Sequence, residues 1–268
     1  MKVVLFCGGQ GMRLREFSDK IPKPMVPIGY RPILWYIMKY YAHFGHKDFI
    51  LCLGYMGDTI KNYFVNYDEY LSNDFVYSKG GNNLSLLNKD IDDWTITFAD
   101  TGINTSLGER LLAVKKYLEG ESCFLVNYSD VLTDLPLPEM IEHFHKIDKT
   151  GMFMVTPPQR SFHVVHFDGD NEVNEISALS NSGLWVNAGY FIFKNKIFDY
   201  LRPGEDLVDN ALQQLVPQNE LSVYPYHGTW ITMDTFKEKQ LLDDMYGRGD
   251  TPWEVWKGKE LKKVSVTA

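Results

Sequence analysis

A glycine-rich loop near the start of the chain carries residue types that bind phosphate. It directly follows the apolar run 3–6 and consists of Gly8, Gly9, Gln10, Gly11, Met12 and Arg13. Glycines allow a sharp backbone turn and bring bare amide groups against phosphate oxygens. An arginine adds a charged clamp that can form two parallel hydrogen bonds. The loop has neither the Gly-Lys-Ser/Thr ending of a Walker loop nor the spacing of a dinucleotide fingerprint, so by itself it is also compatible with a purely structural turn.

The second group that could do chemistry is Lys23, which stands between Pro22 and Pro24. Prolines fix their own φ and restrict the residue before them, so we expect Lys23 on a stiff extended segment rather than in a helix. Alone, it could be an ordinary solvated loop lysine. Together with Arg13 it indicates two fixed cations. Such cations stabilise the charge on a transferred nucleotidyl phosphate, where positioning and electrostatics supply most of the catalysis.

The composition limits the classes of protein that could carry these groups. The chain has 268 residues, 44% of them hydrophobic and 23% charged, which is typical of a globular protein with a sizeable core. A net charge of −8 disfavours nonspecific binding to nucleic acid or to anionic membranes. We read no membrane span and no signal peptide. Three cysteines in apolar surroundings predict buried thiols in a reducing compartment, so we expect a cytoplasmic protein.

The order of the expected elements places the loop at the end of a strand. Buried strands are expected at 3–6, 49–53 and 122–127, an edge strand at 94–99, and helices at 32–44, from 58, at 107–118 and at 137–146. This order predicts a Rossmann-like, mixed but mostly parallel sheet flanked by helices, with ligands at the carboxyl ends of its strands. Residues 67–94 are less regular. The second half is richer in strands, expected at 152–156, 164–167, 186–193 and 221–226.

We therefore expect a single domain over residues 1–268. Within it, residues 1–150 form a nucleotide-binding half, residues 151–256 an acceptor-binding half, and residues 257–268 a lysine-rich tail. The sequence contains no linker between the halves, no internal repeat and no low-complexity segment.

Several motifs together resemble the sugar-1-phosphate nucleotidyltransferase family. They are the loop GGQGMRL, the run PKPMVPIG around Lys23, the run PILW at 32–35, the segment FILCLGY at 49–55, the turn DTG at 100–102, the run WITMDT at 230–235 and the run PWEVW at 252–256. The first two are specific for the superfamily. The last two favour its cytidylyl branch, the bacterial glucose-1-phosphate cytidylyltransferases. The resemblance implies a glycosyltransferase-A-like fold, a homo-oligomer and magnesium-dependent transfer of a nucleotide from a nucleoside triphosphate to a sugar 1-phosphate.

The resemblance also implies roles for individual residues. Arg13 and Lys23 match the catalytic cations of the family, and Asp130 and Asp234 match its magnesium ligands. Nucleotide contacts are expected from the loop residues 8–13, Lys23, Thr105, Arg110 and Tyr128. Magnesium suits the two aspartates, because it prefers oxygen ligands and bridges carboxylates to substrate phosphates. The family's Tyr-Gly-Asp reads Tyr128-Ser129-Asp130 in this chain.

The acceptor half departs from the family pattern. Where the family has a Glu-Lys-Pro element whose lysine binds the sugar phosphate, this chain has Ser177-Ala178-Leu179, and a later glutamate aligns with Asn210. Arg160 and Asn187 are the expected acceptor-binding residues. A charged hydrogen bond contributes about 1.5–3 kcal/mol, so losing the lysine is not a neutral change. Arg160, His163 or Lys194 could replace it, the acceptor could differ, or the gapped alignment could be displaced.

Three functions therefore stay open. The first is a cytidylyltransferase for glucose 1-phosphate or another phosphorylated acceptor. The second is a uridylyl- or thymidylyltransferase built on the same loop. The third, of a different class, is a non-catalytic subunit that senses nucleotides or sugar phosphates. The missing acceptor lysine favours the sensor, whereas Arg13, Lys23, Asp130 and Asp234 oppose it.

Overall fold

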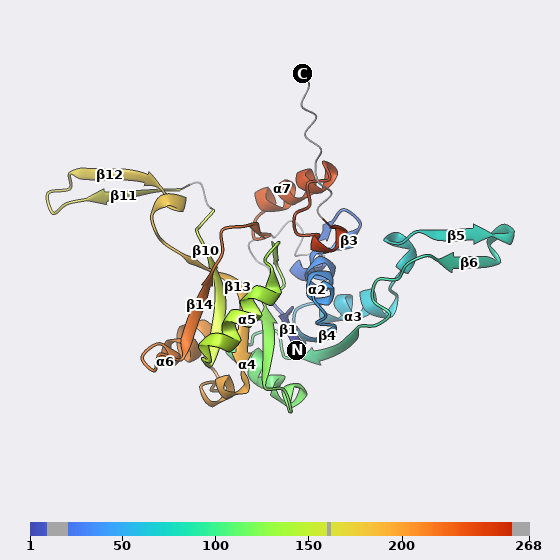
Figure 1. Cartoon of the computed structure of the whole chain (residues 1–268), viewed down its shortest axis with the longest axis horizontal. Coiled ribbons are helices and arrows are strands. Elements are labelled where there is room, and N and C mark those ends of the chain that lie inside the picture. The colour runs from blue at the N-terminus through green and yellow to red at the C-terminus, as the bar shows by residue number, and fades with distance from the viewer. Residues whose placement is uncertain (10–20, 160–161, 259–268) are drawn as a thin grey trace, which may run out of the picture.

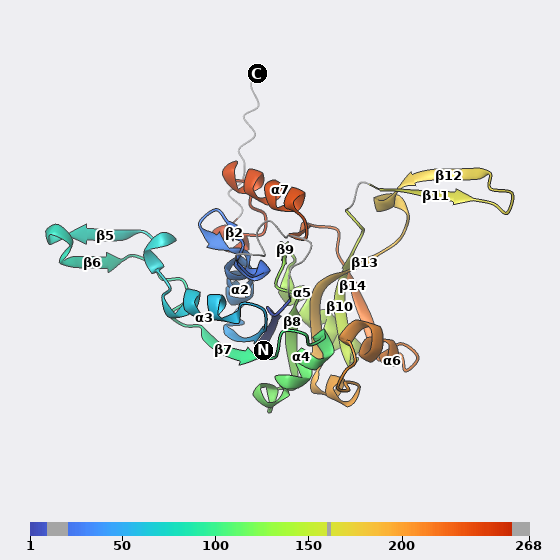
Figure 2. The same cartoon turned by 180° about the vertical axis from the view of Figure 1, so that it is seen from behind.

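The computed structural model describes residues 1–9, 21–159 and 162–258. A seven-stranded sheet runs through its centre in the order β14-β10-β13-β8-β1-β4-β7 (Figures 1 and 2). All adjacent pairs are parallel except β10·β13 and β13·β8, so β13 alone runs against the other six strands. The mixed, mostly parallel sheet expected from the sequence is confirmed. Three of its strands, β10, β13 and β14, come from the second half of the chain and continue the sheet begun by the first.

Where the sequence predicted an element, its bounds agree closely with the expected range. The helix over 236–247 and the short strands at 27–28, 31–32, 131–133 and 230–232 were not predicted. The sheet strands are β1 (Val3–Phe6), β4 (Asp48–Leu53), β7 (Thr95–Asp100), β8 (Cys123–Asn127), β10 (Gly151–Thr156), β13 (Val186–Lys194) and β14 (Leu221–Pro225). The helices are α2 (Ile33–His43), α3 (Gly57–Val65), α4 (Leu107–Ala113), α5 (Leu137–Ile147), α6 (Gln213–Leu215) and α7 (Phe236–Gly247). The short strand pairs are β2 (Pro27–Ile28) with β3 (Arg31–Pro32), β5 (Phe75–Ser78) with β6 (Asn83–Leu86), β9 (Val131–Thr133) with β15 (Trp230–Thr232), and β11 (His163–Phe167) with β12 (Val173–Ala178).

Both faces of the sheet are covered, which explains why its central strands are continuous apolar runs. Val3 and Leu5 of β1 point to the face packed by α2 and α5, whereas Val4 and Phe6 point to the face packed by α4. The three cysteines are free and buried, as predicted. Burial raises the pKa of the Cys7 thiol to about 12, so this thiol stays protonated near neutral pH. No helix in the described part of the chain is long and apolar enough to cross a membrane.

Two expectations about regular structure were incomplete. The range 67–94, read as irregular, contains the ribbon β5–β6, and β12 in the second half was missed. Both ribbons project from the body of the molecule (Figures 1 and 2). The helix expected over 107–118 is α4 followed by a separate turn, Lys115–Leu118, with Val114 between them in a non-helical conformation. The lysine-rich tail falls almost entirely on residues 259–268, which lie outside the described residues.

Candidate active site

Three neighbouring strands of the sheet end at one buried arginine. Arg110 on α4 donates hydrogen bonds to the carbonyl oxygens of Gly8 (3.1 Å), after β1, and Leu53 (3.3 Å), at the end of β4. It also donates to the Thr101 hydroxyl (2.8 Å) and to the Ile103 carbonyl (3.2 Å), both after β7. Only 3% of Arg110 is exposed. The arginine therefore sets the relative positions of the three loops at this edge of the sheet.

The glycines of these loops are required by close approach. A Cβ added at Gly8 would lie 1.9 Å from the Arg110 Nη1 atom, and one at Gly54 would lie 2.5 Å from the Gly102 carbonyl oxygen. Both distances are far below van der Waals contact, so a larger residue would force the loops apart. Gly102 itself has φ +91°, which favours glycine, and its carbonyl accepts a hydrogen bond from the Thr105 hydroxyl (3.1 Å).

A lysine and two aspartates from distant parts of the chain form one cluster at the same edge. The Lys23 Nζ atom lies 2.6 Å from Asp130 Oδ2 and 2.5 Å from Asp234 Oδ1. The short pair β9–β15 brings the aspartates together: Thr232 pairs with Val131, and the next residue, Met233, donates its N–H to the Asp130 carbonyl oxygen (3.0 Å). The register of β9 with β15 could not be predicted from residue types or from their spacing in the sequence.

The backbone around Lys23 differs from the expectation. The residues Lys23–Met25 form a single 3-10 turn rather than an extended segment. Pro22 is extended, as expected, with φ −67° and ψ 148°. Pro24 is tolerated because the early positions of a helical turn need no N–H donor and because the proline φ already suits the turn. The prediction of an extended conformation at Lys23 is therefore wrong, whereas Pro22 has the extended conformation that was expected.

Burial and charge shift the pKa values of this cluster. Desolvation acts to lower the pKa of the Lys23 ammonium, but the attraction of Asp130 and Asp234 outweighs it, so the pKa is raised. Desolvation also raises the pKa of Asp130, and the positive charge of Lys23 opposes that shift. The raised pKa of Lys23 keeps its ammonium group charged at neutral pH.

The backbone turn before Asp130 explains a difference from the family motif. Ser129 has φ +66°, the left-handed region in which glycine is favoured, and the family carries glycine at this position. Its N–H donates to Asn127 Oδ1 (2.7 Å), and its hydroxyl accepts from the Cys7 thiol (3.5 Å). These buried contacts hold a non-glycine residue in the strained conformation and fix the direction of Asp130.

A cavity of about 710 Å³ lies between the strand ends and the Lys23 cluster. Its lining includes many residues that the sequence had singled out, namely Gly9, Lys23, Thr105, Arg110, Tyr128, Asp130 and Asp234. Gly8 stands behind it against Arg110. The expected residues Gln10, Gly11, Met12, Arg13 and Arg160 lie outside the described residues. The nucleotide-binding and metal-binding candidates that the structure describes are thus gathered around one cavity.

The acceptor candidate Asn187 contacts Tyr128, a tyrosine that lines this cavity. Its side-chain N–H donates to the Tyr128 hydroxyl (2.9 Å), while its Oδ1 atom accepts from the Gly189 N–H (2.9 Å). Gly189 has φ +81°, and a Cβ there would lie 2.7 Å from the Tyr128 ring. Asn187 therefore positions Tyr128 in the cavity wall.

The prediction that Lys194 could replace the missing acceptor lysine is wrong. It pairs in register with Cys123 at the beginning of β8, at the opposite edge of the sheet from the cavity, and it forms an ion pair with Asp148 (2.5 Å). Ala178, which stands at the position of the family's lysine, lies at the end of β12 opposite His163.

Asp206 is one of several cavity residues that the sequence analysis did not single out. Asp206 lines the cavity, its Oδ1 atom accepts from the Val208 N–H (2.8 Å), and its own N–H donates to Asn210 Oδ1 (2.8 Å). Asn210, where the family has a glutamate, is exposed and turned back onto this backbone. Asp206 could have been recognised as a helix N-cap, because aspartate before an apolar helical run is typical of that position, but not as a cavity residue.

Taken together, these features define a candidate active site for a phosphate-containing ligand in an α/β fold. Gly8 and Gly9 follow the first strand, and the side chains of Lys23, Asp130 and Asp234 line a cavity at the carboxyl ends of parallel strands. Ligands bind at this edge in open α/β sheets.

Comparisons with known proteins identify the family. The family Nucleotidyl transferase matches residues 2–243, and the chain belongs to it; it is a nucleotidyltransferase. A probable glucose-1-phosphate cytidylyltransferase of Bacillus subtilis is 34% identical over 267 residues, covering 96% of this chain and 100% of that protein. The glucose-1-phosphate cytidylyltransferase of Salmonella typhi is 34% identical over 265 residues, with the same coverage. The expected resemblance is confirmed.

A solved structure supports the fold. The structure of UDP-glucose pyrophosphorylase in complex with UDP-glucose superimposes with a TM-score of 0.68 at 18% identity, over 92% of this chain and 98% of that one. At this identity the likeness bears on the fold alone, and it agrees with the glycosyltransferase-A-like architecture expected from the sequence.

Proposed function

We propose that this nucleotidyltransferase joins CTP and a sugar 1-phosphate to give a CDP-sugar and pyrophosphate. The observation that carries the proposal is the Lys23 ammonium held between Asp130 and Asp234 at the cavity beside the glycine turn. Cytidine as the base is supported by the two relatives that are named glucose-1-phosphate cytidylyltransferases and match nearly the whole chain.

In the proposed reaction, a phosphate oxygen of the acceptor attacks the α-phosphorus of the nucleotide. A new P–O bond forms, the bond from the α-phosphorus to the bridging oxygen breaks, and pyrophosphate leaves with that electron pair. The amides of Gly8 and Gly9 and the lysine at 23 would stabilise the negative charge on the phosphoryl oxygens. Arg13 is proposed as a second cation for the same phosphates. Thr105 and Tyr128 would contact the bound nucleotide, and Arg110 would fix the loops that hold it.

The residues of the site fit a magnesium ion, which we propose as the cofactor. The described part of the chain contains no group of three or more His, Cys, Asp or Glu side chains that could hold a metal ion. Two carboxylates are, however, what magnesium takes from a protein when substrate phosphates and waters complete its shell. Asp130 and Asp234 would be those two ligands. When bound, the ion would neutralise charge on the phosphate oxygens.

The experiment that tests this function is a pyrophosphate-release screen with magnesium. CTP, UTP, dTTP, GTP and ATP are each combined with a panel of phosphorylated acceptors that begins with glucose 1-phosphate. We expect release with CTP and at least one sugar 1-phosphate. Release with UTP or dTTP instead would favour the uridylyl or thymidylyl alternative. No release with any pair would overturn the enzyme proposal and leave the sensing subunit, which the missing acceptor lysine at Ala178 favours. The three buried free thiols support a cytoplasmic location.

We further propose that Asp206 binds hydroxyl groups of the acceptor. A carboxylate repels phosphate, so its place in this cavity suits the neutral part of a substrate. The Asp206 and Asp209 charges contribute, after burial, to the raised pKa of the Tyr128 hydroxyl, which places both aspartates near the wall that Asn187 supports.

Asp206→Asn is therefore expected to raise the KM for the acceptor about 10- to 100-fold, because a charged hydrogen bond contributes about 1.5–3 kcal/mol. The KM for the nucleotide should stay within about twofold of the unchanged protein. Asp199→Asn, on an exposed aspartate that is not among the described cavity residues, is the matched control. Steady-state kinetics with each substrate varied in turn separates these effects. An equal effect of both substitutions, or a rise in the nucleotide KM alone, would contradict the assignment.

A further inference from the structure

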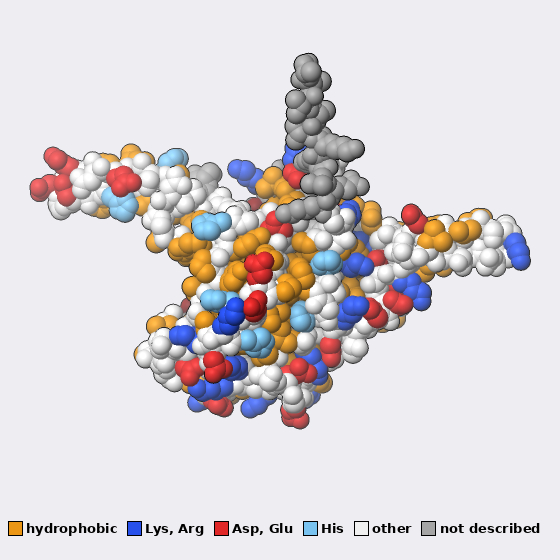
Figure 3. All heavy atoms as spheres, viewed as in Figure 1, with side chains coloured by type: hydrophobic (Ala, Val, Ile, Leu, Met, Phe, Trp, Pro, Cys, Tyr) orange, Lys and Arg blue, Asp and Glu red, His pale blue; other side chains and the backbone are white. Residues whose placement is uncertain are grey.

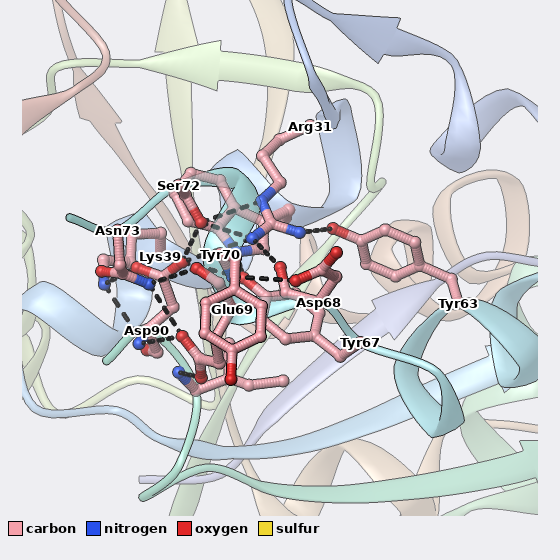
Figure 4. Close-up of polar contacts among 12 residues, drawn as sticks. Arg31, Lys39, Tyr63, Tyr67, Asp68, Glu69, Tyr70, Ser72, Asn73 and Asp90 are labelled. Atoms are coloured by element: carbon pink, nitrogen blue, oxygen red, sulfur yellow. Dashed lines mark hydrogen bonds and ion pairs between the residues drawn. The ribbon is translucent and has the colours of Figure 1, made fainter. Parts of the chain in front are cut away.

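The Lys23 side of the charged cluster depends on a buried network outside the cavity (Figure 4). The segment of Lys23 continues into the hairpin β2–β3. Arg31 of β3 is fully buried and donates hydrogen bonds to the Ser72 hydroxyl (3.1 Å) and the Asp68 carbonyl oxygen (2.7 Å). Lys23 is therefore placed by a hairpin that is fixed to the core.

Asp234, on the other side of the cluster, stands on a short connection between strand β15 and helix α7. The residue before it, Met233, donates its N–H to the Asp130 carbonyl oxygen (3.0 Å), which links the backbones of the two aspartates. The next two N–H groups, of Asp234 and Thr235, lie beyond the end of β15. Backbone N–H groups at such a place must find an acceptor outside the strand pair.

A single carboxylate accepts both of these N–H groups. Glu238 Oε2 lies 2.7 Å from the Asp234 nitrogen and 2.9 Å from the Thr235 nitrogen. The Thr235 hydroxyl in turn accepts the Glu238 N–H (3.3 Å), which completes a capping box at the start of α7. A capping box needs only the bond from the glutamate to the N-cap residue, here Thr235. The bond to Asp234 is additional, and it ties α7 to a residue of the cavity.

Glu238 differs in this respect from the acidic side chains of the surface. Asp and Glu side chains are spread over the face seen in Figure 3, on the body and at the far end of β11–β12. Water screens the interactions of such exposed groups, so each contributes little to the structure. Glu238 is half-buried, and its carboxylate accepts two charge-assisted hydrogen bonds, which are about twice as strong as neutral ones.

We propose that Glu238 is a positioning residue of the metal site, which fixes the backbone at Asp234 and through it the carboxylate that would bind magnesium. The inference rests on the proposed function, in which Asp130 and Asp234 are the magnesium ligands. Two carboxylates repel each other, so a metal ion binds them more tightly when the protein already holds them in place. The bond from Met233 to Asp130 restrains one side of Asp234, and the carboxylate of Glu238 restrains the other. Without Glu238, the ion itself must order the Asp234 backbone.

The first test is manganese binding to Lys23→Ala proteins without nucleotide. Lys23→Ala removes the ammonium group that lies between the two aspartates. Manganese takes the same oxygen ligands as magnesium, and the electron paramagnetic resonance signal of the free ion falls as it binds. Adding Glu238→Ala should weaken manganese binding about 10-fold, the lower end of the loss found when a group that orients a metal ligand is removed.

Two further substitutions in the same background separate positioning from helix capping. Thr235→Ala removes the acceptor of the Glu238 N–H but leaves the Glu238 carboxylate its bond to Asp234. It should lower the melting temperature, as the loss of an N-cap does, and keep the manganese affinity within about twofold. Glu238→Gln keeps an acceptor oxygen at the same place and should restore most of the affinity.

The second test uses the enzyme with Lys23 in place. For Glu238→Ala we expect the magnesium concentration at half-maximal rate to rise about 10-fold, while kcat at saturating magnesium stays within about twofold of the unchanged protein. A residue that only stabilises α7 would change the amount of folded enzyme and leave the magnesium requirement as it is.

The outcomes distinguish this inference from the proposed function. Equal manganese affinity with and without Glu238→Ala, or an equal loss with Thr235→Ala, would overturn the positioning role while the metal site stands. If Lys23→Ala binds no manganese at all, Asp130 and Asp234 are not metal ligands, and the proposed metal site fails together with the inference.

Discussion

Replacing Lys23 with alanine is expected to lower the rate of nucleotidyl transfer by about 10²- to 10⁴-fold, the range found when a charged or hydrogen-bonding group that stabilises a transition state is removed. Lys23 is 13% exposed at its side chain and lies 2.6 and 2.5 Å from two carboxylates that face the cavity. Lys23→Arg should restore only part of the rate, because a planar guanidinium does not fit the position of a compact ammonium group.

The same substitution has a second expected result that does not depend on turnover. Without ligands, the ammonium group occupies the space between Asp130 and Asp234 and competes with a metal ion for them. Lys23→Ala removes this competitor and leaves two like charges close together. Magnesium should therefore raise the melting temperature of Lys23→Ala more than that of the unchanged protein when no nucleotide is present.

Single-turnover kinetics and magnesium-dependent thermal unfolding check these two results. Lys146→Ala, which removes an exposed lysine on α5, is the control and should leave both unchanged. Full activity of Lys23→Ala would show that Lys23 has no role in the reaction. If magnesium raised the melting temperatures of Lys23→Ala and of the unchanged protein equally, Asp130 and Asp234 would not be its ligands.

The part of the fold that the sequence predicted is the part with strong local patterns. Strands such as β1 and β8 are buried on both faces and therefore appear as uninterrupted apolar runs. Helices such as α2 show apolar residues at the spacing of three and four. The ribbon β5–β6 lacks such a pattern, because its strands have four residues each and are joined by Lys79, two glycines and Asn82.

The site was predictable as a set of residues but not as an arrangement. The resemblance supplied Lys23, Asp130 and Asp234, and the structure brings them together. Their contact depends on the register of β9 with β15, a pairing between positions about 100 residues apart that no local pattern encodes. The positions of Asp206 and Asn210 relative to the cavity were not predictable either. Asn210 turns away from the cavity while Asp206, one helical turn earlier, lines it.

Arg110 shows how a residue can be recognised while its role is not. The resemblance implied a nucleotide contact, and the structure places Arg110 in the cavity wall. Its guanidinium, however, donates hydrogen bonds to Gly8, Leu53, Thr101 and Ile103, which belong to three different loops. This arrangement favours a positioning role, in which Arg110 acts on the nucleotide through the loops that it holds.

Arg110→Met is accordingly expected to destabilise the protein by about 3–5 kcal/mol, as is typical when a buried charged hydrogen-bond network is broken. Each charged hydrogen bond contributes about 1.5–3 kcal/mol, but the full sum is not expected. The Gly8 and Leu53 carbonyls also accept backbone N–H groups, from Tyr55 and Thr101, and so keep one partner. Urea unfolding measures the free energy. Arg202→Met, at an exposed arginine that donates to its own loop carbonyls, is the control and should stay within about 0.5 kcal/mol of the unchanged protein.

The functional effect of Arg110→Met distinguishes positioning from direct contact. If Arg110 acts through the loops, nucleotide affinity should fall for every base and for nucleoside mono-, di- and triphosphates alike, because the Gly8 turn and the Thr105 segment both shift. If it binds a particular phosphate directly, the loss should appear only with ligands that carry that phosphate. Calorimetric titration at a temperature where the variant is folded separates the two patterns. A variant as stable as the unchanged protein would contradict the positioning role, because four hydrogen bonds to three loops cannot be removed without cost if they hold those loops together.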